Sequence, residues 1–168
     1  WVDVCKDWDD CADVVIDDVP KADMPMPSDG EITLKITSVA DADEKKGHVP
    51  AYHFDIVRLS DGESVGTTDL RLGYVRNLYY GGNIGYAVKE EYRGNAYAQK
   101  AARLVLEIAR AHGMPYVIIT CSKENDASRK TLEHLNGTLL ETKAPPKYSG
   151  LYQSGATGEH CIFRFDLN

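Results

Sequence analysis

The chain has 168 residues, of which 43% are hydrophobic and 27% are charged, values typical of a soluble protein that folds as one domain. The formal net charge of -7 argues against nucleic acid as a partner, because phosphate binding needs a basic surface. No apolar stretch is long enough to cross a bilayer, the four cysteines lack CxxC spacing, and the first residues do not resemble a signal peptide. We therefore expect a cytoplasmic protein with reduced thiols and no membrane partner.

The first 30 residues form an acidic segment with nine aspartates that ends in a proline-rich run. Asp7-Trp8-Asp9 begins like a calcium-binding loop, but alanine and aspartate stand where such a loop needs its glycine and its closing glutamate. A solvated acidic segment with a few apolar side chains packed on the domain is the favoured interpretation. We expect residues 1–30 to be an acidic N-terminal lead-in and residues 31–168 to be a single domain.

Alternation of apolar and polar residues predicts a series of half-buried strands after the lead-in. The expected strands cover 32–37, 52–57, 67–72 and 84–88, with a hairpin turn at 60–63 and a loop at 73–82. Gly85, inside the last of these strands, indicates a bulge or a close approach of another group to the backbone.

The second half of the chain combines helices and strands. Apolar residues at helical spacing predict an amphipathic helix from about 96 to 112, and Gly113 ends it. Residues 116–121 are apolar on both faces, which favours a buried strand. The remaining expected elements are a helix at 125–135 with Ala127 facing inward, a strand at 137–142, a loop at 144–158 and a strand at 160–167. This order predicts an α/β (α+β) fold, a mixed sheet with helices packed on it.

A stretch of small residues beside Arg93 lies between the expected strand 84–88 and the helix that follows. The free N–H groups in the first turn of a helix favour an anion, above all a phosphate, and small residues let the phosphate approach the backbone. A dinucleotide-binding loop would need GxGxxG and a P-loop GxxxxGK[ST], and the stretch matches neither well. From the residues alone, a phosphate cradle and a simple tight turn remain equally open.

The sequence of this loop and of the following helices resembles the GNAT superfamily of acyl-CoA-dependent N-acyltransferases. The pyrophosphate loop of that superfamily reads [QR]-x-x-G-x-[GA] after a strand, and here the corresponding residues are Arg93-Gly94-Asn95-Ala96-Tyr97-Ala98, with alanine in place of the glycine. A later helix in the superfamily opens with Asn, as Asn125-Asp126-Ala127-Ser128 does here. Gly81 to Tyr86 also resembles a bacterial subgroup of unknown substrate.

The resemblance implies a mostly antiparallel central sheet with two splayed strands and acetyl-CoA bound between them. The cofactor-binding residues that it implies are Tyr86, Ala87, Val88, Arg93, Gly94, Asn95, Ala96, Tyr97, Ala98, Asn125 and Ser128. Gly85 would supply the bulge that opens the gap between the strands. The two helices that the superfamily usually places after its first strand have no room between Val39 and Val49, so we expect the loop 144–158 or the first 30 residues to replace them as the wall of the acceptor site.

The implied activity is N-acetyl transfer from acetyl-CoA to a primary amine by direct attack in a ternary complex. Many members protonate the leaving thiolate with a tyrosine, but the matching position here is Leu132, so Ser128 becomes the expected catalytic proton donor. Asp69, near the expected acceptor end of its strand, is the expected base. Asp55 and a chain of water molecules are the alternatives, and a solvent-exposed carboxylate would look the same in the sequence. The acceptor is a small-molecule amine or a peptide amine, the protein is a monomer or a homodimer, and no metal site is expected because the histidines lack ligand spacing. The alternative is a non-catalytic CoA-binding or interaction module.

Overall fold

The computed structural model describes residues 14–15, 25–43, 45 and 48–167. Most of the expected acidic lead-in, including Asp7-Trp8-Asp9 and Ile16, lies outside the described residues. The part of the lead-in that is described includes strand β1 (Val14–Val15), which pairs antiparallel with β5 (Gly73–Tyr74).

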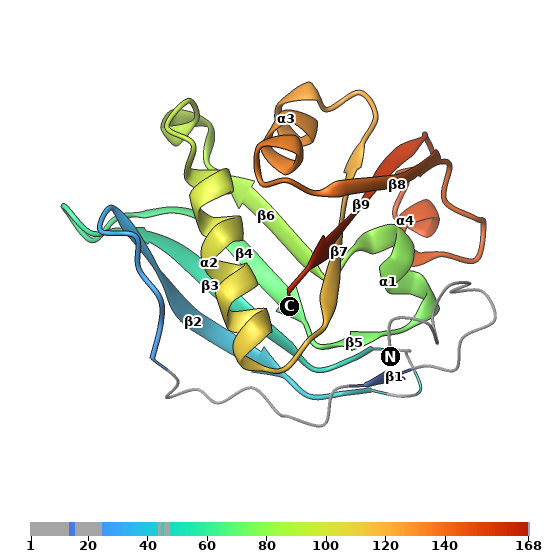
Figure 1. Cartoon of the computed structure of the whole chain (residues 1–168), viewed down its shortest axis with the longest axis horizontal. Helices are drawn as coiled ribbons and strands as arrows, with labels where there is room; N and C mark the ends of the chain where they lie inside the picture. The colour runs from blue at the N-terminus through green and yellow to red at the C-terminus, as the bar shows by residue number, and fades with distance from the viewer. Residues whose placement is uncertain (1–13, 16–24, 44, 46–47, 168) are drawn as a thin grey trace.

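A four-stranded antiparallel sheet forms the first half of the domain (Figure 1). Its strands, in the order β2-β3-β4-β6, are β2 (Ile32–Ala40), β3 (Ala51–Arg58), β4 (Ser64–Arg71) and β6 (Ile84–Val88). Alternate side chains of these strands point to opposite faces. One face carries the buried residues Leu34, Phe54 and Leu70, and helix α2 (Tyr97–Ala111) packs against this sheet.

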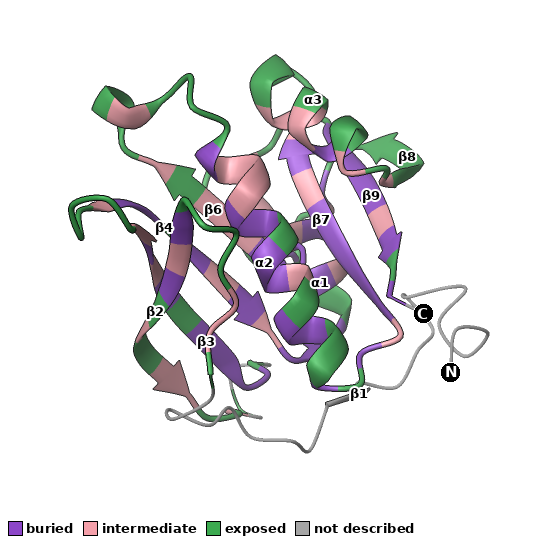
Figure 2. Ribbon diagram, turned by 60° about the vertical axis from the view of Figure 1, so that its left-hand side comes forward, coloured by how far each residue is buried: buried purple, intermediate pink, exposed green. Residues whose placement is uncertain are grey.

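A three-stranded antiparallel sheet forms the second half and has the order β7-β9-β8. It consists of β7 (Tyr116–Ser122), β8 (Thr138–Lys143) and β9 (His160–Asp166), and helix α3 (Asp126–His134) lies between β7 and β8 in the chain. Many of the buried residues lie on α2, β7 and β9, whereas β8 is exposed along its length (Figure 2). The predicted mixed α+β fold is therefore confirmed, and the two sheets share one core.

Two segments expected as loops contain short helices. Residues 73–82 form β5 and helix α1 (Arg76–Gly81), and the segment 144–158 contains helix α4 (Gly150–Gln153). These helices are too short for helical periodicity to stand out in the sequence. They pack against each other, and α1 buries Leu78 and Tyr80, so tertiary contact rather than pattern decides their conformation.

The expectation for Ala127 is wrong, and the structure decides between the two alternatives given for Gly85. Ala127 is exposed at the start of α3 instead of facing inward, because only Leu132 of that helix is fully covered. The β4–β6 ladder runs through Gly85 without a register shift, so this glycine marks a close approach and not a bulge. A Cβ at Gly85 would lie 3.3 Å from the Asp69 carboxylate, which explains why glycine is needed there. Among the described residues, no helix has the length and apolar character needed to span a bilayer.

Candidate active site

Asn83 joins β6 to β7 at the point from which the two strands diverge (Figure 1). Its backbone N–H donates to the Ile118 carbonyl at 2.6 Å, and its side-chain oxygen accepts the Ile118 N–H at 2.8 Å. The side-chain amide donates to the carbonyls of Gly73 at 2.8 Å and Arg71 at 3.2 Å. Beyond this junction β6 and β7 belong to different sheets, so a gap opens between them. The predicted splay is present, and Asn83 rather than a bulge produces it.

The edge of β6 that faces this gap offers backbone hydrogen-bonding groups. The Arg71 N–H bonds to the Asn83 carbonyl and the Lys89 N–H to the Val65 carbonyl. Because hydrogen-bonded pairs alternate along an antiparallel ladder, Gly85 and Ala87 also point their polar groups toward β4. The N–H groups of Tyr86 and Val88 therefore point the other way, toward the gap. An extended ligand lying there can bond to this edge as an added strand.

The loop between β6 and α2 forms the second part of the site. It contains a short 3₁₀ turn, Glu90–Tyr92, followed by Gly94 with φ 88° and Ala96 with φ 59°. Ala96 is the N-cap of α2 and makes no side-chain bond to the first turn of that helix. The N–H groups of that turn therefore point toward the loop in front of the helix. The positive end of the helix dipole lies at the same place, so the site favours an anion.

A cavity of about 470 Å³ connects this loop, β6 and the start of α3. It is lined by Tyr86, Ala87, Val88, Tyr92, Arg93, Gly94, Ala96, Tyr97, Ala98, Asn125, Ala127, Ser128 and Thr131. We call it the cleft. Every cofactor-binding residue expected from the sequence lines the cleft except Asn95, whose side-chain amide instead donates to the Tyr92 carbonyl at 3.0 Å. The cleft additionally includes Tyr92, Ala127 and Thr131, which lie within the same motifs but were not expected.

Ser128 is held in the cleft by two neighbours. The side-chain oxygen of Asn125 accepts the Ser128 backbone N–H at 3.1 Å and so caps α3. The Ser128 hydroxyl lies 2.7 Å from the Tyr86 hydroxyl, which comes from β6. Leu132, one turn further along α3, is 0% exposed and belongs to the core.

Two groups in this part of the cleft have shifted pKa values. Burial raises the pKa of the Tyr86 phenol, and the bond to Ser128 partly opposes this shift. Burial also raises the pKa of the Cys121 thiol to about 11, with Cys161 adding to the shift and the Ser128 hydroxyl opposing it. Both side chains are therefore neutral at physiological pH. Cys121, which is buried on β7, has the character of a structural thiol rather than a nucleophile.

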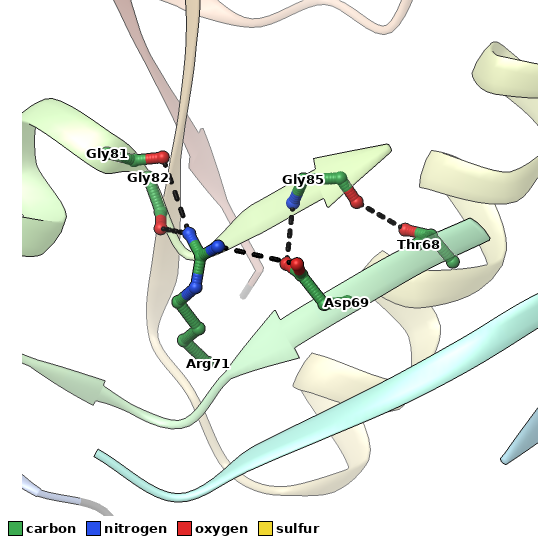
Figure 3. Close-up of polar contacts among 6 residues, drawn as sticks. All are labelled: Thr68, Asp69, Arg71, Gly81, Gly82 and Gly85. Carbon is green, nitrogen blue, oxygen red and sulfur yellow. Dashed lines mark hydrogen bonds and ion pairs between the residues drawn. The ribbon is translucent and has the colours of Figure 1, made fainter. Parts of the chain in front are cut away.

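Asp69 belongs to a network on the outer face of β4 (Figure 3). One carboxylate oxygen accepts the Gly85 N–H at 2.9 Å, and the other lies 3.3 Å from the Arg71 guanidinium. Arg71 also donates to the carbonyls of Gly82 at 2.8 Å and Gly81 at 3.5 Å. The ion pair between Asp69 and Arg71 is thus tied to the residues that lead into β6.

Two further cavities continue from the cleft. The first, of about 380 Å³, contains Asp69 and His53 and shares Tyr86 and Ala87 with the cleft. The second, of about 510 Å³, shares His53 with the first and is walled by α1 and α4 through residues such as Leu78 and Leu151. We call these two cavities the acceptor groove. The short helices α1 and α4 therefore wall the second cavity, and α4 lies in the segment 144–158 that was one of the two expected to provide such a wall. His53 was also missed, although its pairing with Asp69 across β3 and β4 places both on one face.

The comparisons with known proteins agree with this geometry. Residues 6–138 match the family model of the acetyltransferase (GNAT) domain, and the chain therefore belongs to the GNAT acetyltransferase family. This family consists of acyl-CoA-dependent acetyltransferases that use acetyl-CoA as co-substrate. The predicted family is thereby confirmed. No curated protein sequence matches the chain.

Solved structures resemble the chain in fold at low sequence identity. An acetyltransferase of the GNAT family from Bacillus anthracis has a TM-score of 0.55 at 19% identity, covering 68% of this chain and 66% of that one. A ribosomal-protein-S5-alanine acetyltransferase from Vibrio fischeri has a TM-score of 0.55 at 21% identity, covering 70% and 62%. The ribosomal L7/L12 α-N-protein acetyltransferase RimL, solved with coenzyme A, has a TM-score of 0.60 at 13% identity, covering 84% and 98%. The chain thus spans less than two thirds of the length of the first two proteins.

Proposed function

We propose that the chain transfers an acetyl group from acetyl-CoA to a primary amine by direct attack in a ternary complex. The observation that carries the proposal is the cleft, which joins a free strand edge, a helix start without a side-chain cap and the Asn125–Ser128 turn. Family membership supports the chemistry. The alternative, a non-catalytic CoA-binding module, shares the cleft but needs no acceptor groove.

The parts of the cleft fit the parts of acetyl-CoA. The pyrophosphate would lie against the backbone N–H groups from Arg93 to Ala98, with the positive charge of Arg93 nearby. The pantetheine arm is extended and carries amides, so it would lie along the Tyr86–Val88 edge, with Asn125 on its other side. The thioester would then reach the point where the cleft and the acceptor groove share Tyr86 and Ala87.

Acetyl transfer needs a polarised carbonyl, a deprotonated amine and a proton for the leaving thiolate. An N–H group on the free edge of β6 would polarise the thioester carbonyl. Ser128 is the proposed proton donor, because its hydroxyl lies in the cleft in the first turn of α3, 2.7 Å from the Tyr86 phenol, and Leu132 has no proton to give.

Asp69 is the proposed base for the incoming amine, because it borders the acceptor groove beside Tyr86 and Ala87.

The acceptor groove is open enough for a small amine or for the end of a peptide. Two of the similar structures are enzymes named for ribosomal proteins, one of them an α-N-protein acetyltransferase. This likeness supports a peptide amine as an acceptor to test beside small amines.

Calorimetric titration with acetyl-CoA tests the cofactor part of the proposal. We expect saturable binding that Gly94→Trp weakens by at least about tenfold, because a bulky side chain fills the loop where the phosphates approach. Gly113→Trp is the matched control, since Gly113 also has a positive φ and open space around it but follows the far end of α2. No binding by the unmodified protein, or equal loss in both variants, would contradict the proposed cofactor site. Binding without amine-dependent thiol release from any acceptor would favour the non-catalytic module.

The role of Asp69 is tested with Asp69→Asn, which keeps the shape of the side chain. Loss of a general base is expected to lower kcat by about 100-fold. The loss should persist across the pH range in which the amine is mostly protonated and shrink as pH rises and free amine accumulates. His53→Gln is the comparison, because His53 lines the same cavity from the opposite strand. Full activity of Asp69→Asn together with loss in His53→Gln would move the base to His53.

A further inference from the structure

Two hydroxyl groups from distant parts of the chain meet in the cleft. The Tyr86 hydroxyl on β6 and the Ser128 hydroxyl on α3 lie 2.7 Å apart, a short distance for two hydroxyls in a hydrogen bond. Tyr86 lines both the cleft and the adjoining cavity that contains Asp69. Tyr86 therefore borders both cavities, and its hydroxyl lies on the side of the cleft.

The direction of this hydrogen bond follows from the acidity of the two groups. Either hydroxyl can donate in this pair, and because a phenol is a stronger acid than an aliphatic alcohol, the Tyr86 O–H is the favoured donor and the Ser128 oxygen the favoured acceptor. The Ser128 hydrogen is then left to point away from Tyr86. The Ser128 hydroxyl also interacts with the Cys121 thiol on β7, which is neutral at physiological pH.

We propose that Tyr86 is a positioning residue for the proton transfer, orienting and polarising the Ser128 hydroxyl toward the sulfur of coenzyme A and replacing the proton that Ser128 gives up. The proposal rests on the proposed function and assigns a role to the Tyr86 side chain, in addition to the role of its backbone on the strand edge. A chain of two hydroxyls is a better donor than one, because each hydrogen bond strengthens the next. It also explains how a serine can act as the proton donor in a family where a tyrosine phenol often has that role.

The proposed step balances in protons and electrons. The amine nitrogen bonds to the carbonyl carbon and loses one proton to the base, and the C–S bond breaks with its electron pair on sulfur. Sulfur takes the Ser128 proton while Ser128 takes the Tyr86 proton. Water returns a proton to the tyrosinate, and the protonated base releases one to water, so both groups are restored.

The first test needs no acceptor amine and uses coenzyme A bound to the whole protein. The ultraviolet absorbance of the thiolate is followed against pH, with S-methyl coenzyme A as the blank. If Ser128 donates to sulfur, the pKa of the bound thiol lies below that of free coenzyme A, because a hydrogen bond to the charged form favours that form. Tyr86→Phe keeps the ring and should raise the pKa of the bound thiol by about half a unit.

Tyr79→Phe is the matched control, because it removes a phenol that bonds to Glu141 away from the cleft. It should leave the pKa of the bound thiol unchanged. An unchanged pKa in Tyr86→Phe, with normal coenzyme A affinity, would overturn the role of Tyr86 alone. If the unmodified protein binds no coenzyme A, the proposed function itself fails, so the two failures are distinguishable.

The second test is a double-mutant cycle with a peptide carrying N-terminal serine or alanine, or with benzylamine where the peptide does not turn over. Tyr86→Phe should lower kcat about tenfold and change the KM for acetyl-CoA by less than about twofold. Ser128→Ala should lower kcat about 100-fold, and the double variant should be no slower than Ser128→Ala. Multiplicative losses would show that Tyr86 does not act through Ser128 and would overturn the proposal.

Discussion

At the scale of single residues, the backbone of Ala96 is strained, because this alanine adopts a left-handed conformation that usually requires glycine. It occupies the position where the resembling motif has glycine, and its φ of 59° places it in the left-handed region. A residue with a Cβ pays about 1–2 kcal/mol for this conformation. The backbone thus keeps the glycine-like turn before α2 even though the side chain has changed. The loop retains its shape for an anion at some cost in stability.

Replacing Ala96 by glycine should relieve this strain. We expect Ala96→Gly to raise the free energy of unfolding by about 1 kcal/mol, measured by urea denaturation. Ala98→Gly makes the same change two residues later, inside α2, and should lower the free energy of unfolding by about 0.5–1 kcal/mol. The same sign for both variants would contradict the assignment of strain to Ala96.

Also at this scale, the residues of the phosphate loop were accessible to sequence reasoning, whereas the contact of Tyr86 with Ser128 was not. Gly94, Ala96 and Asn125 belong to short motifs, and a motif made of neighbouring residues can be recognised in a single sequence. Tyr86 and Ser128 are 42 positions apart, and only the packing of β6 and α3 along the cleft brings their hydroxyls together.

At the scale of elements, the junction of β6 and β7 decides the shape of the site. Asn83 is 0% exposed, and its side chain accepts one hydrogen bond from Ile118 of β7 and donates two others, to the carbonyls of Arg71 and Gly73. Gly82 beside it has φ 82°, and a Cβ there would lie 3.1 Å from the Ile118 carbonyl. These two residues let the strands touch at one point and separate beyond it. Neither the hydrophobic periodicity nor the pyrophosphate-loop motif identifies Gly82 and Asn83 as the residues at which the two strands diverge.

Loss of the Asn83 side chain should be costly, because buried partners would be left without hydrogen bonds. We expect Asn83→Leu to lower the free energy of unfolding by about 2–4 kcal/mol in urea denaturation. Asn77→Leu on the exposed surface of α1 is the control and should change it by no more than about 0.5 kcal/mol. A small effect at Asn83 would mean that the junction is held by the backbone alone.

At the scale of the whole molecule, the cleft spans two sheets that share a core but not a hydrogen-bonded ladder. Its lining combines β6 of the four-stranded sheet with α3, which precedes β8 of the three-stranded sheet. A ligand bound there would connect both halves. Binding at 100 times the dissociation constant adds about 2.7 kcal/mol to the free energy of unfolding.

Amide hydrogen exchange with and without acetyl-CoA should show where this stabilisation acts. We expect the largest slowing at Tyr86, Val88 and the first turn of α2, with a smaller and uniform slowing in the core of both sheets. The exposed strand β8 serves as the internal reference, because it does not line the cleft. Protection confined to β8 or α4 would place the ligand outside the cleft.

The sequence by itself determined the family and the order of most strands and helices, and it located the loop before α2 that we propose to bind the cofactor. Each of these depends on residues close together in the chain, where spacing carries the information. Only the tertiary structure decided the short helices α1 and α4, the junction at Asn83, the Tyr86–Ser128 pair and the acceptor groove. These features arise from contacts between elements far apart in the chain, and a single sequence holds no local pattern for such contacts.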